Sequence, residues 1–312
     1  MAIDDTIIEK TGKKMAEVGT LYDHARKRFV LGHTLVTSQY ITPFASFPIG
    51  FRLYCKRDKK EEGFKTKIEM AKELVKQAVE KGLRFKTVIF DAWFLSKDFA
   101  EFIDSKELNW ISSAKCNRII TVEGKRVKLE EFHYRLTESD FEKIEIDKKF
   151  YYCFVKTVKM SKLGKVRLLI VHEDLSDNPK YLVANNPRWD ARRILKVYKS
   201  RWQIEIFYRD SKQNLGLQDY EMRDLQGIKR HWYLVFLSYS LLTLSSLDGK
   251  LRRWITANVR TIGEKCRMTA VEIIRDFTLW ILKQNDLKRS VDEIITLMFE
   301  SESKFGERFH LA

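Results

Sequence analysis

The feature that most constrains this chain is the stretch 190–212, which contains neither glycine nor proline. It opens on Asp190, a typical N-cap residue placed shortly after Pro187, and therefore predicts one long helix. At about 100° per residue, four polar side chains of that helix share one narrow strip. They are Tyr198, Arg201, Glu205 and Lys212.

Apolar residues flank this strip on both sides, so the strip is predicted to face the interior. One flank holds Ile194, Val197, Ile204 and Tyr208, and the other holds Leu195, Trp202 and Ile206. A carboxylate brought inside in this way is costly unless it is paired or holds a metal ion. Two interpretations stay open: an Arg201–Glu205 ion pair one turn apart, or a metal-binding Glu205.

The spacing Tyr198-x2-Arg201-x3-Glu205-x6-Lys212 resembles the Tyr-Arg-Glu-Lys signature of DDE transposases from bacterial and archaeal insertion sequences. Within this group it is similar to the branch called insertion-sequence family four, whose Arg-Trp-x-Ile-Glu-x-Phe context is present at 201–207. The resemblance implies an α/β fold, with an RNase H-like mixed sheet flanked by helices. It also implies that Glu205 is the last member of an Asp, Asp, Glu triad.

The first acid of such a triad is expected in the run Asp4-Asp5-Thr6, directly after a short apolar strand. Strand alternation allows only one of the two aspartates to face a site. In the resembling family the catalytic aspartate directly precedes a threonine, which makes Asp5 the preferred residue and Asp4 the alternative. An exposed acidic turn is the simpler interpretation of the same residues.

The second acid is expected to be Asp91, which ends the continuous apolar run 87–91. Such a run is typical of a central strand, and open α/β sheets bind ligands beyond the carboxyl ends of their strands. The sequence Asp91-Ala92-Trp93-Phe94 resembles the family's Asp-Ser-Trp-Tyr pattern but departs from it at Ala92 and Phe94. Alternatively, Asp91 caps the helix predicted after it.

The resemblance therefore assigns Asp5, Asp91 and Glu205 as catalytic and metal-binding residues. Carboxylate oxygens suit Mg²⁺ or Mn²⁺, and a pair of such ions supports in-line displacement at phosphorus. The implied reaction is nicking of double-stranded DNA at the terminal inverted repeats, followed by strand transfer to target DNA, with a hairpin intermediate as an optional route. None of the six histidines is assigned to a metal.

Further residues are expected to contact DNA. By resemblance, Tyr198, Arg201 and Lys212 bind phosphates beside the scissile bond. Lys115, Asn117 and Arg118 resemble a family Lys-x-Asn-Arg run, although a solvated turn explains them equally well. Trp202 is grouped with these residues, while packing is its simpler role. The net charge of +15 and the pI near 9.5 agree with a polyanionic partner.

The coarse organisation expected is an RNase H-like core in two parts, 1–116 and 187–246, a β-rich insertion at 117–186 and a helical region at 247–312. Within 1–54 we expect a three-stranded meander, followed by a helix at 64–81, a helix at 96–106 with Ser96 as its N-cap, and strands at 87–91 and 110–114. A buried helix is expected at 232–247, which is too short to cross a bilayer, and further helices at 270–284 and 290–301.

Four widely spaced cysteines and the absence of a signal peptide at the N-terminus predict buried thiols in the reducing cytoplasm. Two alternatives to an active transposase stay open. The first is a truncated DNA-binding relic without catalysis, because no helix-turn-helix precedes Asp5. The second is an RNase H-like nuclease, because three carboxylates fit that activity as well. A transposase is expected to act as a homodimer on DNA, because it pairs two ends.

Overall fold

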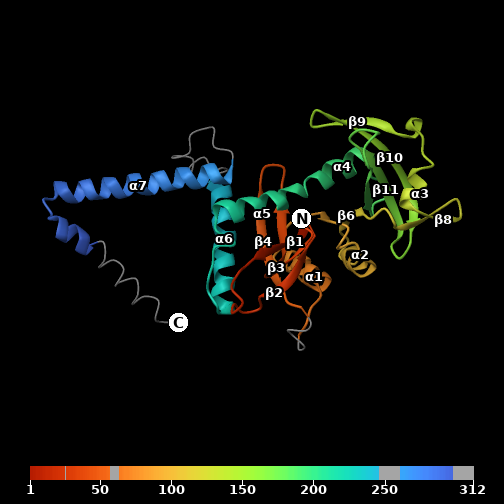
Figure 1. The fold of residues 1–312 in the computed structure, drawn as a ribbon. Helices are drawn as coiled ribbons and strands as arrows, with labels where there is room; N and C mark the ends of the chain where they lie inside the picture. The colour runs from red at the N-terminus through yellow and green to blue at the C-terminus, as the bar shows by residue number, and fades with distance from the viewer. Residues whose placement is uncertain (25, 57–62, 246–260, 298–312) are drawn as a thin grey trace. The chain divides into compact units, whose positions relative to one another are not determined.

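The structure is a computed structural model that describes residues 1–24, 26–56, 63–245 and 261–297. The chain divides into two compact units, Met1–Thr243 and Leu244–Ala312. The first unit contains a mixed sheet and the helices that cover it (Figure 1). The acidic residues of interest all belong to this first unit.

Six strands form the N-terminal part of the sheet. They are β1 (Ala2–Glu9), β2 (Gly19–Asp23), β3 (Arg28–Ile41), β4 (Ser46–Tyr54), β5 (Thr87–Phe90) and β6 (Asn109–Ala114). Strand β1 lies between β3, with which it is antiparallel, and β5, with which it is parallel; β5 is in turn parallel to β6. This order, with β4 on the outer side of β3, is that of an RNase H-like sheet and confirms the predicted fold class.

The predicted three-stranded meander is wrong in two respects. Strand β1 pairs with β3 and not with β2, and a fourth strand, β4, was missed. A local pattern does not specify which strands pair, and Pro48 disguises β4 because proline is unusual within a strand. The pairing of β3 with β4 tolerates it through a register shift at Ser38 and Gln39.

The region 117–186 extends the same sheet instead of forming a separate one. It contains β7 (Ile119–Val122), β8 (Lys125–Lys128), α3 (Leu129–His133), β9 (Glu142–Ile146), β10 (Lys149–Met160), β11 (Gly164–His172) and β12 (Lys180–Ala184). Strand β12 is antiparallel to β6, with Ala184 opposite Ile111. The β-rich region therefore continues the sheet at the β6 edge of the core.

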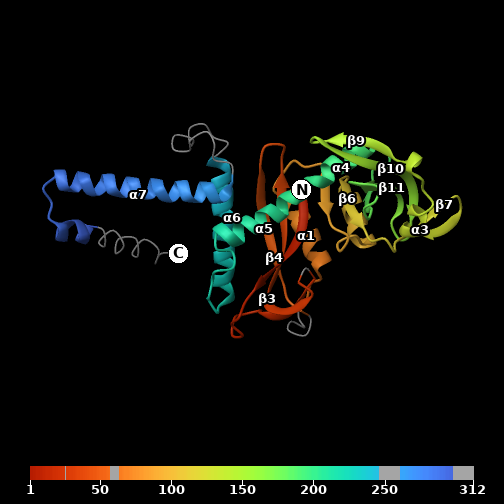
Figure 2. The same cartoon turned by 45° about the horizontal axis from the view of Figure 1, so that its top comes forward.

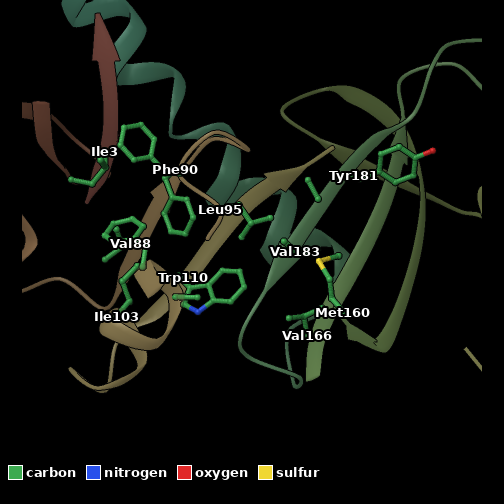
Figure 3. Close-up of a cluster of buried hydrophobic side chains, with 14 of the residues drawn as sticks. Ile3, Val88, Phe90, Leu95, Ile103, Trp110, Met160, Val166, Tyr181 and Val183 are labelled. Carbon is green, nitrogen blue, oxygen red and sulfur yellow. The ribbon is translucent and has the colours of Figure 1, made fainter. Parts of the chain in front are cut away.

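Two helices on one face pack on a large apolar core. Helix α1 (Lys67–Glu80) begins at a Thr66 capping box, and α2 (Lys97–Asp104) begins at the predicted N-cap Ser96. Their core runs from the central strands into the β-rich extension, as the labelled side chains of Figure 3 show. Its members there include Ile3, Val88, Phe90, Trp110, Val166 and Val183.

Helices α4 (Ala191–Lys199) and α5 (Trp202–Asn214) lie over the other face. The predicted N-cap Asp190 accepts a hydrogen bond from the backbone N–H of Arg193 at 2.7 Å. The single long helix predicted at 190–212 is wrong, because a short turn at Ser200 and Arg201 divides it. The N–H groups of both residues bond three residues back, and the Ser200 hydroxyl donates to the Val197 carbonyl. Helix α4 runs on into α5 in Figure 2.

Helix α6 (Leu225–Ser245) corrects the prediction of a buried helix. Trp232, Val235, Phe236 and Tyr239 are buried, but other large side chains are exposed. The exposed ones include Tyr233, Leu234, Leu237, Leu241 and Leu244. No helix among the described residues is long and apolar enough to span a membrane.

The second unit contains α7 (Ile262–Asp286), which begins earlier than the predicted helix at 270–284. Its Thr261 capping box, formed with Glu264, explains the earlier start. Helical structure resumes at 291–297, and the end of the helix predicted at 290–301 lies outside the described residues.

The prediction of four buried thiols holds only for Cys153. Cys116 is exposed, while Cys55 and Cys266 are half-buried.

Candidate active site

Three acids from separate elements are directed to one region of the first unit. Asp4 lies on β1, Asp91 follows the last residue of β5, and Glu205 lies in the first turn of α5. Asp4 is paired in the sheet with Thr37 of β3, whose hydroxyl is 2.5 Å from the Tyr208 hydroxyl of α5. Since cross-strand partners share a face, Asp4 lies on the face that α5 covers.

Arg201 links two of these acids. Its Nη1 donates to Asp4 Oδ2 at 2.7 Å, and its Nη2 donates to Glu205 Oε1. All three side chains are largely shielded, with exposed fractions of 18% for Arg201, 15% for Asp4 and 30% for Glu205. The Arg201–Glu205 ion pair considered from the sequence is therefore present, and Asp4 is added to it.

Burial, and then the neighbouring charges, shift the pKa values of the site. Burial raises the pKa of Asp4 to about 7; the Arg201 charge opposes the rise, and the charges of Asp91 and Asp5 add to it. Burial likewise raises the pKa of Asp91, against the hydrogen bonds it accepts and the charge of Arg201. Burial lowers the pKa of Arg201, but Asp4 and its other neighbours outweigh this and leave it raised. Buried acids that interact in this way are typical of functional sites.

Asp91 is held by its own turn. Its Oδ1 accepts the backbone N–H groups of Trp93 at 3.0 Å and Phe94 at 3.3 Å. The following helix α2 is capped by Ser96 instead. The helix-cap interpretation of Asp91 is thus wrong, because Asp91 caps a tight turn at the end of β5.

Asp5, the aspartate preferred from the sequence, is on the opposite side of β1 from Asp4. Its Oδ2 accepts from Lys67 Nζ of α1 at 2.8 Å. The Lys67 ammonium also lies 4.9 Å from the ring centroid of Trp93, whose indole is 45% exposed. The geometry brings Asp4, and not Asp5, into contact with the Arg201–Glu205 pair.

The donor chemistry of the site suits a hard divalent cation, since Asp4, Asp91 and Glu205 supply only carboxylate oxygens. Across the residues that the structure describes, no group of three or more His, Cys, Asp or Glu side chains is arranged to hold a metal ion. The three carboxylates thus have the chemistry that binds a metal ion, but in this structure the Arg201 guanidinium binds an oxygen of Asp4 and an oxygen of Glu205.

The remaining strip residues have distinct surroundings. Lys212 Nζ donates to Thr6 Oγ1 at 2.9 Å and to the Ile7 carbonyl at 2.8 Å. Tyr198 is half-buried, with the Arg201 guanidinium 5.9 Å from its ring centroid. Trp202 is 59% exposed, so its expected packing role is wrong: the α5 residues that pack inward are Ile204, Phe207 and Tyr208.

The run at 115–118 leaves the end of β6. Lys115 and Asn117 are exposed, whereas Arg118 is half-buried and donates to the carbonyl of Leu95. Arg118 therefore braces the loop between Asp91 and α2, and the first two residues face solvent.

Two site residues were missed from the sequence, Lys67 and Tyr208. Lys67 is the first residue of α1, and nothing in the local pattern links it to Asp5. Tyr208 was counted as an apolar flank, but its buried hydroxyl bonds to Thr37 beside Asp4. One signal could have found it: a tyrosine, unlike a phenylalanine, needs a polar partner when buried.

Two of the histidines lie side by side. His133 Nε2 and His172 Nε2 are 3.0 Å apart, and His172 Nδ1 is 2.8 Å from the carbonyl oxygen of Asp177. This pair lies in the β-rich extension, where it joins α3 to β11.

An RNase H-like sheet with an acidic cluster between β1, the end of β5 and a covering helix is the framework of an enzyme that acts on nucleic-acid phosphodiesters. Residues 1–241 match the transposase DDE domain family, and the chain belongs to that family. It is thus a transposase-family protein of DNA recombination. No curated protein matches the chain.

Proposed function

We propose that this protein is a transposase of the insertion-sequence family-four type, which nicks DNA at transposon ends and joins the freed 3′-hydroxyl to target DNA. The observation that carries the proposal is the contact of Arg201 with Asp4 and Glu205, beside Asp91. Arg201 thereby joins two carboxylates from distant parts of the chain, and the charge of Asp91 reaches both Asp4 and Arg201. Burial of that many acids is costly for a purely structural role.

In this proposal Asp4, Asp91 and Glu205 hold the divalent ions, Mg²⁺ or Mn²⁺. When bound, a pair of such ions activates the attacking oxygen and stabilises the leaving oxygen of an in-line displacement. Support for Asp4 over Asp5 as the first acid comes from its ion pair with Arg201. Asp5 is the alternative first acid, because its charge acts on both Asp4 and Asp91, and the Asp5→Asn variant below tests it.

The basic residues would position the DNA. Arg201 suits bidentate contact with a phosphate, and Lys212 suits a point-charge contact. Lys115, Asn117 and Trp202 are exposed and available to the backbone. The engaged Arg118 would act by holding the Asp91 loop. We further propose a homodimer on DNA, since two ends must be joined.

The test is cleavage of a duplex that carries the ends of the source element. With Mg²⁺ the wild-type protein should nick it, and Glu205→Gln and Asp91→Asn should reduce the rate by about a thousandfold or more. Cleavage that survives Glu205→Gln would overturn the proposal. Cleavage confined to RNA–DNA hybrids would favour an RNase H-like nuclease.

Metal ligation and the choice of first acid can be tested in the same assay. Asp4→Asn should abolish nicking, while Asp5→Asn should retain most of it; the reverse result would assign Asp5. Asp91→Cys should be inactive with Mg²⁺ and regain activity with Mn²⁺, because a thiolate binds the softer ion better. Equal activity of this variant in both ions would argue against ligation by residue 91.

A further inference from the structure

The Arg201 guanidinium occupies the same carboxylate oxygens that a metal ion would need. Its Nη1 donates to Asp4 Oδ2, and its Nη2 donates to Glu205 Oε1. The second oxygen of Asp4, Oδ1, accepts the backbone N–H of Asp5 at 2.9 Å. Both oxygens of Asp4 are thus engaged by donors, and a positive charge already compensates the pair of acids.

A divalent ion and this guanidinium compete for the two acids. A ligand oxygen sits about 2.1 Å from Mg²⁺, so a guanidinium still bonded to that oxygen would lie within a few ångströms of a doubly charged ion. Repulsion at such distances is large in a partly shielded site. Tight metal binding to Asp4 and Glu205 therefore requires Arg201 to leave.

A destination for Arg201 exists once DNA is present. Its planar fork binds a phosphate as well as it binds a carboxylate. Its turn between α4 and α5 is held by bonds to three residues back and not by a regular helical ladder. The guanidinium can therefore exchange one anionic partner for another of the same geometry.

We propose that Arg201 is an exchangeable counter-ion, which binds Asp4 and Glu205 in the DNA-free protein and moves to a DNA phosphate when the two carboxylates take up metal. This inference rests on the proposed function and deepens it. Its consequence is coupling: DNA binding strengthens metal binding, and metal binding strengthens DNA binding by the same factor. Arg201 thereby balances the negative charges of Asp4 and Glu205 until DNA binds.

Arg209 provides a matched control. It is an arginine of the same helix α5 and pairs with an acid, but that acid is Asp210, at 3.1 Å, and not Asp4 or Glu205. Arg209→Met removes one positive charge from the helix without freeing Asp4 or Glu205. Arg201→Met removes one positive charge and frees both.

The experiment measures Mn²⁺ binding by electron paramagnetic resonance to the full chain without DNA. Arg201→Met should bind Mn²⁺ about tenfold more tightly than the wild type, and Arg209→Met should stay within about threefold of it. Arg201→Lys, which keeps the charge but cannot bridge two acids, should fall between them. Adding an end-bearing duplex should tighten Mn²⁺ binding to the wild type and leave Arg201→Met nearly unchanged.

A loss of Mn²⁺ affinity in Arg201→Met, in place of the expected gain, would overturn the inference. If Arg201 merely holds the acids in place, Arg201→Met will bind Mn²⁺ more weakly than the wild type, and the duplex will tighten both equally. Should Arg201→Met fail to fold, Arg201→Lys carries the same comparison. Absence of Mn²⁺ binding to every form, with and without the duplex, would instead overturn the proposed function itself.

Discussion

Asp4 and Asp5 are adjacent in the chain, yet they have different partners because a strand turns successive side chains to opposite faces. Asp4 meets Arg201 beneath α5, and Asp5 meets Lys67 of α1. Burial beneath α5 raises the pKa of Asp4 to about 7. The raised pKa gives a direct test of which aspartate lies in the buried cluster.

Asp4→Asn is expected to change how stability depends on pH. The folded-state pKa of about 7 lies above the ordinary value of 3.8, so Asp4 favours folding most at low pH, and this contribution is lost as pH rises through 7. In the presence of a chelator, the free energy of unfolding of the wild type should fall by about 2 kcal/mol more than that of Asp4→Asn when the pH is raised from 5 to 8. Urea unfolding at both pH values measures it, and parallel pH curves would contradict the prediction.

Tyr208 and Thr37 should be energetically coupled. Their hydroxyl oxygens are 2.5 Å apart in a buried setting, so removing one hydroxyl leaves the other unsatisfied. Tyr208→Phe and Thr37→Val should each cost about 1–2 kcal/mol, and the double variant should cost about 1 kcal/mol less than their sum. A double-mutant cycle of unfolding free energies checks this, and strict additivity would show that the hydrogen bond contributes nothing.

At the scale of elements, the site depends on how closely β1 and β3 approach. Gly32 of β3 lies opposite Glu9 of β1, and a Cβ built at Gly32 would come within 2.3 Å of the Ile8 carbonyl oxygen. That contact is with backbone, which cannot rotate away. Ile7, the residue before Ile8 in β1, accepts a hydrogen bond from Lys212 through its carbonyl oxygen. Glycine at position 32 therefore keeps β1 in register beneath α5.

Gly32→Ala should destabilise the fold by about 2 kcal/mol or more, because the two strands must separate. Gly19→Ala is the matched control, since Gly19 pairs with Gly32 from the other side and a Cβ there meets nothing within 4 Å. The control should cost less than about 1 kcal/mol. Chemical denaturation of both variants measures the difference, and equal losses would show that the close approach is not limiting.

At the scale of the whole molecule, the net charge of +15 predicts DNA binding that weakens steeply with salt. The exposed cations beside the site should account for part of that dependence, and those far from it should not. Lys115 follows the end of β6, and its carbonyl accepts from the backbone N–H of Arg118, the residue that bonds to Leu95 after Asp91. Lys76 lies further along α1, where it is 3.7 Å from Glu80.

Lys115→Met should lower the slope of log affinity against log salt by about one, as expected for the loss of one phosphate contact. Lys76→Met should leave the slope unchanged. Fluorescence anisotropy with an end-bearing duplex over a salt series measures both. If the two variants behave alike, Lys115 does not contact the backbone.

Much of this protein could be predicted from local sequence. The apolar run before Asp91, the caps Ser96 and Asp190 and the periodicity of 64–81 each specified an element, because hydrophobic period and capping chemistry act within a few residues. The spacing of Arg201 and Glu205 likewise placed both on one helical face, and they do form an ion pair.

Tertiary structure alone decided the rest. It paired β1 with β3, added β4 to the sheet, and turned Asp4 toward Arg201 and Asp5 toward Lys67. These outcomes depend on which distant segments meet, and the free energy of such contacts is set by burial and charge in the assembled fold, not by neighbours along the chain. The sequence by itself determined the acids and the elements that bear them; only the folded sheet decided which acid shares a counter-ion with Glu205.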